Sequence, residues 1–173
     1  MKNPILVVTA TAILCAGTAA AQKSEANRLR AADSTFVTKA AEGGLAEVEL
    51  GNLAKEKATN QKVKDFGQRM VTDHTKANSE LQSAVSGKGI TLPTSIDSKS
   101  QAQKTRLSNL SGAAFDRAYM EDMVRDHKAD VAEFEKESNS GTDPDVKAFA
   151  AKTLPTLQEH LKLAEDALAA VKK

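Results

Sequence analysis

The chain has 173 residues, of which 40% are hydrophobic and 27% charged, a composition typical of one domain with a modest core. Lys and Arg number 24 against 23 Asp and Glu, so the net charge of +1 argues against a nucleic-acid-binding protein, which would show a basic excess. The single cysteine excludes an internal disulfide framework and a cysteine-built zinc site.

Residues 1–21 are predicted to be a secretory signal that is cleaved after Ala21. Lys2 precedes an apolar run over residues 5–16, the segment holds no acidic residue, and Ala19 and Ala21 form an Ala-x-Ala exit. The run is short for a membrane span, and an uncleaved anchor is the alternative. Loss of Lys2 and Cys15 leaves a chain with 23 basic and 23 acidic residues and no thiol, which suits an oxidising compartment. We therefore expect a periplasmic or secreted protein without an integral membrane span.

Residues 22–32 lack clear periodicity and are predicted to form a flexible leader before a helical domain over residues 33–173. Apolar residues recur there at helical spacing, and no alternating run typical of a strand occurs. Asp33 is expected to cap the first helix, Thr59 or Asn60 to open the second, and Asp143 to cap the last. The predicted long helices span about 33–58, 60–86, 112–138 and 144 onward, with a short helix over 98–110.

The lengths of the connections predict the topology. Two short turns join the long helices in pairs, whereas about 25 residues separate the second helix from the third. A connector of that length can travel the full height of a bundle of helices roughly 35 Å long. The expected fold is therefore all-α, a ferritin-like four-helix bundle with a long crossover between helices 2 and 3. Short loops throughout would have indicated simple up-and-down order.

Each long helix carries one ionisable residue within its apolar stripe. These residues are Glu47, His74, His127 and His160. With the crossover topology their heights along the bundle agree within roughly 6 Å. A carboxylate and neutral imidazoles at one level predict a metal site for Zn, Fe, Cu or Mn. The alternatives are that each histidine is hydrogen-bonded to an ordinary partner such as Tyr119 or water, or that Glu47 pairs with one histidine.

Further polar residues lie close to these positions. Asp73 and Asp126 each precede a histidine and could orient a ligand imidazole, although a solvated charge or an inter-helix ion pair is the alternative. Asp130 follows His127 by one turn and could add a ligand. Tyr119 could hydrogen-bond to the predicted centre.

Familiar catalytic patterns are absent from the sequence. Di-iron bundles use a Glu-x-x-His pair on two helices, whereas the residues three before the histidines are Val71, Val124 and Leu157. No Ser/His/Asp arrangement, glycine-rich phosphate loop or cysteine nucleophile is evident, so no catalytic residue is predicted and an enzyme is the least supported class.

Four segments of the chain resemble a known family. In order they are FV with AAEGGLAEVEL over residues 36–50, RMVTDH over 69–74, FDRAY over 115–119 and LPTLQEH over 154–160. Over residues 33–171 the chain resembles the domain-of-unknown-function family 4142. The resemblance implies an exported bacterial protein with a ferritin-like bundle, often described as an outer-membrane protein, and it supplies no established activity.

Two functions follow as hypotheses. The first is a periplasmic bundle that binds one metal ion through Glu47 and the three histidines, in stress or metal handling. The second is a non-catalytic envelope protein that holds no metal and binds a protein partner through its surface. The histidine geometry separates them, because nitrogens farther apart than about 7 Å could not share one ion.

Overall fold

The computed structural model describes residues 28–172, so the predicted signal segment with Cys15 and the beginning of the predicted leader lie outside the described residues. The described part of the chain is all-α, as predicted, and contains no strand. Its helices are α2 (Ala31–Lys57), α3 (Gln61–Ala84), α4 (Ser98–Ser108), α5 (Gly112–Ser140) and α6 (Pro144–Val171).

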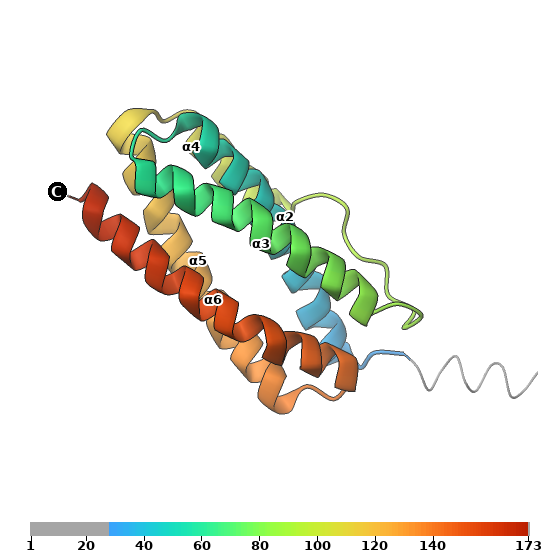
Figure 1. Cartoon of the computed structure of the whole chain (residues 1–173). Helices are drawn as coiled ribbons and strands as arrows, with labels where there is room; N and C mark the ends of the chain where they lie inside the picture. The colour runs from blue at the N-terminus through green and yellow to red at the C-terminus, as the bar shows by residue number, and fades with distance from the viewer. Residues whose placement is uncertain (1–27, 173) are drawn as a thin grey trace, which may run out of the picture.

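The four long helices form a bundle with one long crossover (Figure 1). Helix α2 packs mainly against α3, and α5 against α6, and the two pairs also meet along α3–α6 and α2–α5. Residues 85–111 return from the end of α3 to the opposite end of the bundle, where α5 begins. Helix α4 lies within this crossover and packs on α2 and α5. The connectivity is the one that the length of the connector predicted.

Short polar side chains determine where α3 and α6 begin. Asn60 accepts a hydrogen bond from the backbone N–H of Lys62, as expected of an N-cap residue. Asp143 accepts from two N–H groups of the first turn of α6, and Pro144 fills the position where a missing N–H costs nothing. Both predicted caps are confirmed.

The predicted cap at Asp33 is wrong. Helix α2 begins two residues earlier, at Ala31, and Asp33 lies buried inside it with 1% of its surface exposed. Its carboxylate accepts hydrogen bonds from the N–H and hydroxyl of Thr142 and from the N–H of Asp143, in the turn between α5 and α6. Asp33 therefore links the beginning of α2 to the turn between α5 and α6. This contact could not be predicted from the residues next to Asp33 in the sequence.

Asp116 does the same for the other short turn. This buried side chain, in the first turns of α5, accepts from the N–H and hydroxyl of Thr59 and from the N–H of Asn60, between α2 and α3. A charged acceptor that satisfies several buried donors is a strong contact. Each helix pair is thus held to the other pair at both ends of the bundle.

The core consists of two apolar clusters separated by a polar layer. One cluster lies toward the turn between α2 and α3 and includes Leu50, Phe66, Met70, Tyr119 and Met123. The other lies toward the turn between α5 and α6 and includes Phe36, Leu81, Phe134, Phe149 and Leu157. In each long helix the residue predicted to face inward stands between positions of the two clusters: Glu47, His74, His127 and His160.

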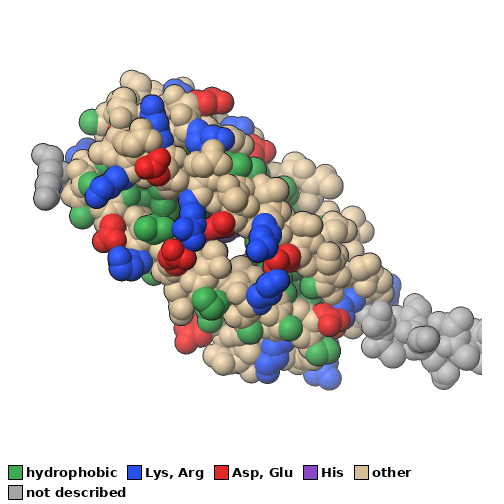
Figure 2. Space-filling view, in the orientation of Figure 1, with side chains coloured by type: hydrophobic (Ala, Val, Ile, Leu, Met, Phe, Trp, Pro, Cys, Tyr) green, Lys and Arg blue, Asp and Glu red, His purple; other side chains and the backbone are tan. Residues whose placement is uncertain are grey.

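The face of the bundle formed by α3 and α6 mixes charges of both signs. On the face formed by α3 and α6, Lys and Arg side chains alternate with Asp and Glu, and no broad area carries a single charge (Figure 2). Within residues 28–172, no helix combines the length and apolarity needed to cross a bilayer.

Candidate metal centre

The three histidines of the chain meet in the middle of the bundle. His74 comes from α3, His127 from α5 and His160 from α6, and they are 7%, 0% and 1% exposed. One ring nitrogen of each lies within 4.8 Å of the others, and the ring centroids are 5.4 to 6.0 Å apart. These distances meet the condition for sharing one ion.

In two of the three imidazole rings, a hydrogen bond to one nitrogen shows that the other nitrogen carries the lone pair. Nδ1 of His127 lies 2.9 Å from the carbonyl oxygen of Met123, which can only accept, so the proton is on Nδ1 and the lone pair on Nε2. Nε2 of His160 lies 2.8 Å from Oδ2 of Asp73 and donates to it, which leaves the lone pair on Nδ1. Nε2 of His74, Nε2 of His127 and Nδ1 of His160 are buried without a hydrogen-bond partner among the described residues.

All three imidazoles are held in the neutral form. Burial lowers the pKa of His74 well below its usual value, and the neighbouring His127 and His160 lower it further. Burial also lowers the pKa of His127 and of His160, and the hydrogen bond to Asp73 offsets part of the effect on His160. A neutral imidazole is the form that binds a metal ion.

Asp73 orients His160 from the outer side. Burial opposes ionisation of Asp73, but hydrogen bonds from His160 and Arg69 outweigh it and lower the pKa of the carboxyl group. Arg69 also bonds to Glu159 at 3.0 Å, which extends the network to the surface. A carboxylate behind an imidazole fixes its tautomer and ring orientation in metal sites.

Glu47 is buried beside this cluster but is not part of it. Its Oε1 lies 3.9 Å from Nδ1 of His127, the nitrogen that bonds to Met123, and so faces the outer edge of that ring. Its Oε2 has no hydrogen-bond partner among the described residues. Burial, with the charges of Asp126 and Asp122, raises the pKa of Glu47 to about 8. The structure therefore brings together three of the four predicted ligands.

The remaining predicted residues take different positions. Asp126 accepts a hydrogen bond from Gln103 of α4 and pairs with Arg125, so it faces α4 rather than a histidine. Tyr119 is fully buried, and its hydroxyl has no partner in the described part of the chain.

Asp130 lies at the margin of the centre. It is half-buried and lines a cavity of about 50 Å³ that reaches His74. Burial and the neighbouring Glu47 raise the pKa of Asp130 to about 7. Asp130 therefore faces the same cavity as His74, and its role as an added ligand stays a prediction.

The donor set fits a four-coordinate transition-metal ion with one open position. Nitrogens about 2.1 Å from such an ion are about 3.4 Å apart, so nitrogens that now lie within 4.8 Å of one another need to approach by up to about 1.4 Å. Three buried nitrogens without a partner among the described residues are otherwise costly, because buried polar groups normally find partners.

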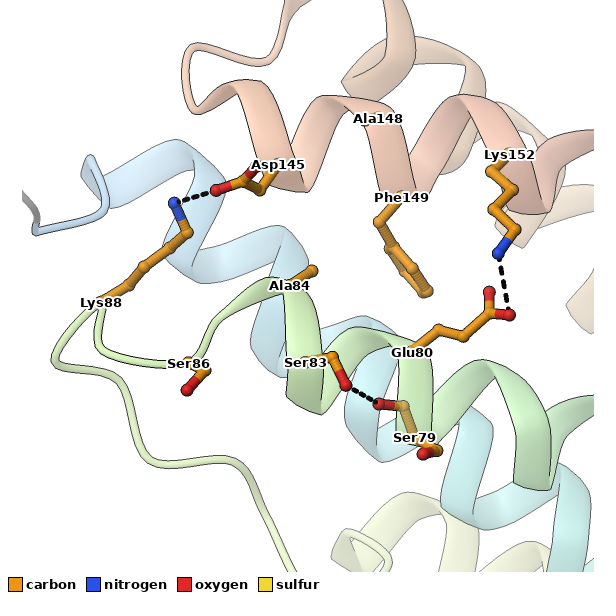
Figure 3. A pocket seen from close by; sticks show the side chains of 10 residues that line it. All are labelled: Ser79, Glu80, Ser83, Ala84, Ser86, Lys88, Asp145, Ala148, Phe149 and Lys152. Atoms are coloured by element: carbon orange, nitrogen blue, oxygen red, sulfur yellow. Dashed lines mark hydrogen bonds and ion pairs between the residues drawn. The ribbon is translucent and has the colours of Figure 1, made fainter.

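A surface pocket of about 620 Å³ lies elsewhere, between the end of α3 and the beginning of α6 (Figure 3). Its charged side chains are already paired: Lys152 with Glu80, and Lys88 with Asp145. The histidines do not line this pocket.

Some partners in the centre were not predicted. The sequence placed Asp73 near a histidine, but its partner is His160 on another helix and not the adjacent His74. The carbonyl of Met123 precedes His127 by four residues, a spacing at which a helical side chain can bond back to the backbone, so this contact had a local signal.

The fold and the buried histidine cluster define an all-helical bundle with a polar centre. A family model described as "Domain of unknown function (DUF4142)" matches residues 18–167, and the chain belongs to that family. A solved structure, "Crystal structure of DUF305 fragment from Deinococcus radiodurans", is similar, with a TM-score of 0.72 and 16% identity over 83% of this chain and 99% of that chain. At that identity the likeness concerns the fold alone. No curated protein matches the chain.

Proposed function

We propose that the protein binds one divalent transition-metal ion through His74, His127 and His160, in metal handling or stress defence outside the cytoplasm. Two observations carry the proposal: ring nitrogens of the three histidines converge, and each ring has a buried nitrogen with no hydrogen-bond partner in the described part of the chain. A cluster that served only packing would be expected to use these nitrogens in hydrogen bonds.

The chemistry of the donor atoms limits which metal ions the site is expected to bind. Neutral imidazoles suit Zn²⁺, Cu²⁺ and Fe²⁺ better than Mn²⁺, which prefers oxygen ligands. The expected affinities rise from Mn²⁺ through Fe²⁺ to Cu²⁺, with Zn²⁺ below Cu²⁺. Water or Asp130 would complete the coordination, since Asp130 lines the cavity at His74.

Export is part of the same proposal. The charged start, apolar run and Ala-x-Ala exit within residues 1–21 support secretion to the periplasm or beyond. The chain without those residues holds no cysteine, so its metal ligands would resist oxidation there.

The test is metal binding by the processed chain purified without a histidine tag. Titration with Zn²⁺, Cu²⁺, Fe²⁺ and Mn²⁺ is expected to give one ion per chain, and the His74→Ala/His127→Ala variant is expected to lose it. Asp73→Asn keeps every ligand and is expected to weaken binding by 10- to 100-fold, because the orienting carboxylate is lost.

Tyr119→Phe is the matched control, since it removes a buried hydroxyl outside the histidine cluster and should leave the affinity unchanged. Circular dichroism on every variant shows whether the helices persist. A wild-type chain that binds none of the four ions would overturn the proposal and favour the metal-free envelope protein.

A further inference from the structure

An acidic groove of about 340 Å³ lies between α2 and α5, beside α4. The acidic side chains that line it are Glu42, Glu47, Asp97, Asp126, Asp130 and Glu133. Its basic side chains among the described residues are Lys39 and Lys99, and Lys39 is paired with Glu133 at 2.6 Å. A cleft lined by an excess of one charge raises the local concentration of the opposite ion.

Glu47 distinguishes this groove from an ordinary acidic surface. It is 4% exposed, and its Oε2 has no hydrogen-bond partner in the described residues, whereas the other acids of the groove are half-buried. A buried carboxylate oxygen without a donor is unfavourable. A cation at the floor of the groove is a partner that would satisfy it.

The groove adjoins the small cavity that reaches His74. Four residues line both spaces: Lys39, Gly43, Asp130 and Glu133. The inner cavity of about 50 Å³ holds one water molecule or a bare ion. Gly43 leaves the junction open, because a Cβ atom there would have no neighbour within 4 Å.

A second opening, between α3 and α6, has the wrong charge for a cation. It is lined by Arg69, Lys76 and Lys152 against two acids, Asp73 and Glu80. Asp73 is moreover occupied by His160 and Arg69. The charged side chains that line the opening between α3 and α6 are therefore net positive and repel a cation, whereas those that line the groove between α2 and α5 are net negative and attract it.

We propose that the acidic groove between α2 and α5 is the route by which a divalent metal ion reaches the three histidines, with Glu47 as a binding point on the way. This inference rests on the proposed metal site and adds where the ion enters. It separates the role of Glu47 from that of the ligands, since its carboxylate acts on the ion before the histidines do.

The test compares rates with equilibrium affinities, using Zn²⁺ alone as the probe and a fluorescent indicator of free Zn²⁺ in a stopped-flow instrument. Gly43→Leu fills the junction and is expected to slow loading on the order of tenfold, with release slowed equally, so that the affinity changes little. Gly43→Ala adds one methyl group in open space and should load at the wild-type rate. Glu47→Gln keeps the shape but replaces a carboxyl group, which can release its proton to bind the ion, by an amide, and it is expected to slow loading on the order of tenfold.

Thr156→Leu narrows the opening between α3 and α6 and is expected to leave the rate unchanged. Loading at the wild-type rate in both Gly43→Leu and Glu47→Gln would refute the proposed route but not the metal site. Slow loading in Thr156→Leu alone would have the same consequence. A wild-type protein that binds no Zn²⁺ at equilibrium would overturn site and route together. The two failures are therefore distinguishable.

Discussion

The crossing of α2 and α3 depends on two glycines whose replacement should be costly. A Cβ atom at Gly51 would lie 2.7 Å from the carbonyl oxygen of Gly67, and one at Gly67 would lie 2.8 Å from the carbonyl oxygen of Gly51. Backbone atoms cannot rotate away as side-chain ends do. The contact is one helical turn from Glu47 and two turns from His74, so it also sets how closely these helices approach at the centre.

The expected magnitude follows from two opposing effects. Replacing glycine by alanine inside a helix favours folding by about 0.5–1 kcal/mol, whereas forcing a methyl group into a filled contact costs about 1–3 kcal/mol. Gly51→Ala should therefore lower the free energy of unfolding by about 1–2 kcal/mol. Gly43→Ala, in the same helix with open space around its Cβ position, should raise it by about 0.5–1 kcal/mol.

Urea unfolding of the metal-free protein, followed by circular dichroism, measures both values, and thermal unfolding should separate the two variants by several degrees. The shared helix and the shared substitution cancel the effect of helix propensity. The reasoning is refuted if Gly51→Ala is as stable as Gly43→Ala, because the close approach of the two backbones would then have no energetic consequence.

Three further predictions concern buried polar groups. With the pKa of Glu47 raised to about 8 from 4.5, the folded state keeps a proton that the unfolded state loses, so this group's contribution to stability is lost as the pH rises between those values. Urea unfolding in the presence of a chelator should show that the free energy of unfolding of the wild type falls by about 3 kcal/mol relative to that of Glu47→Gln between pH 5 and 7.5. Parallel pH profiles of the two proteins would contradict this. Asp116→Asn should cost about 1–3 kcal/mol in the same assay, because Thr59 and Asn60 lose a charged acceptor, and an unchanged midpoint would refute that role. Tyr119→Phe should be neutral or stabilising by up to about 1 kcal/mol, since its hydroxyl has no partner in the described residues, and a clear loss would show that the hydroxyl is bonded.

Local patterns in the sequence were sufficient to predict the helices and which face of each helix points into the core. Asn60 and Asp143 cap helices because their side chains reach N–H groups two or three residues away. Helical periodicity of about 100° per residue placed His127 and His160 within apolar stripes, and both are buried. The length of the connector was enough to predict the crossover, because a chain must be long enough to span the bundle.

Contacts between helices depended on the tertiary structure. Asp33 looked like a cap but bonds to Thr142, more than 100 residues away in the chain. Periodicity placed Glu47 on the inner face of α2, yet helix rotation and side-chain rotamers turn its carboxylate to the outer edge of His127 and into the acidic groove. Composition and periodicity thus determined an all-helical bundle in which Glu47, His74, His127 and His160 lie on the inner faces of the four long helices. Which nitrogens converge, which acid supports them and which groove adjoins Glu47 were decided only by packing, because these depend on distances of a few ångströms between residues far apart in the sequence.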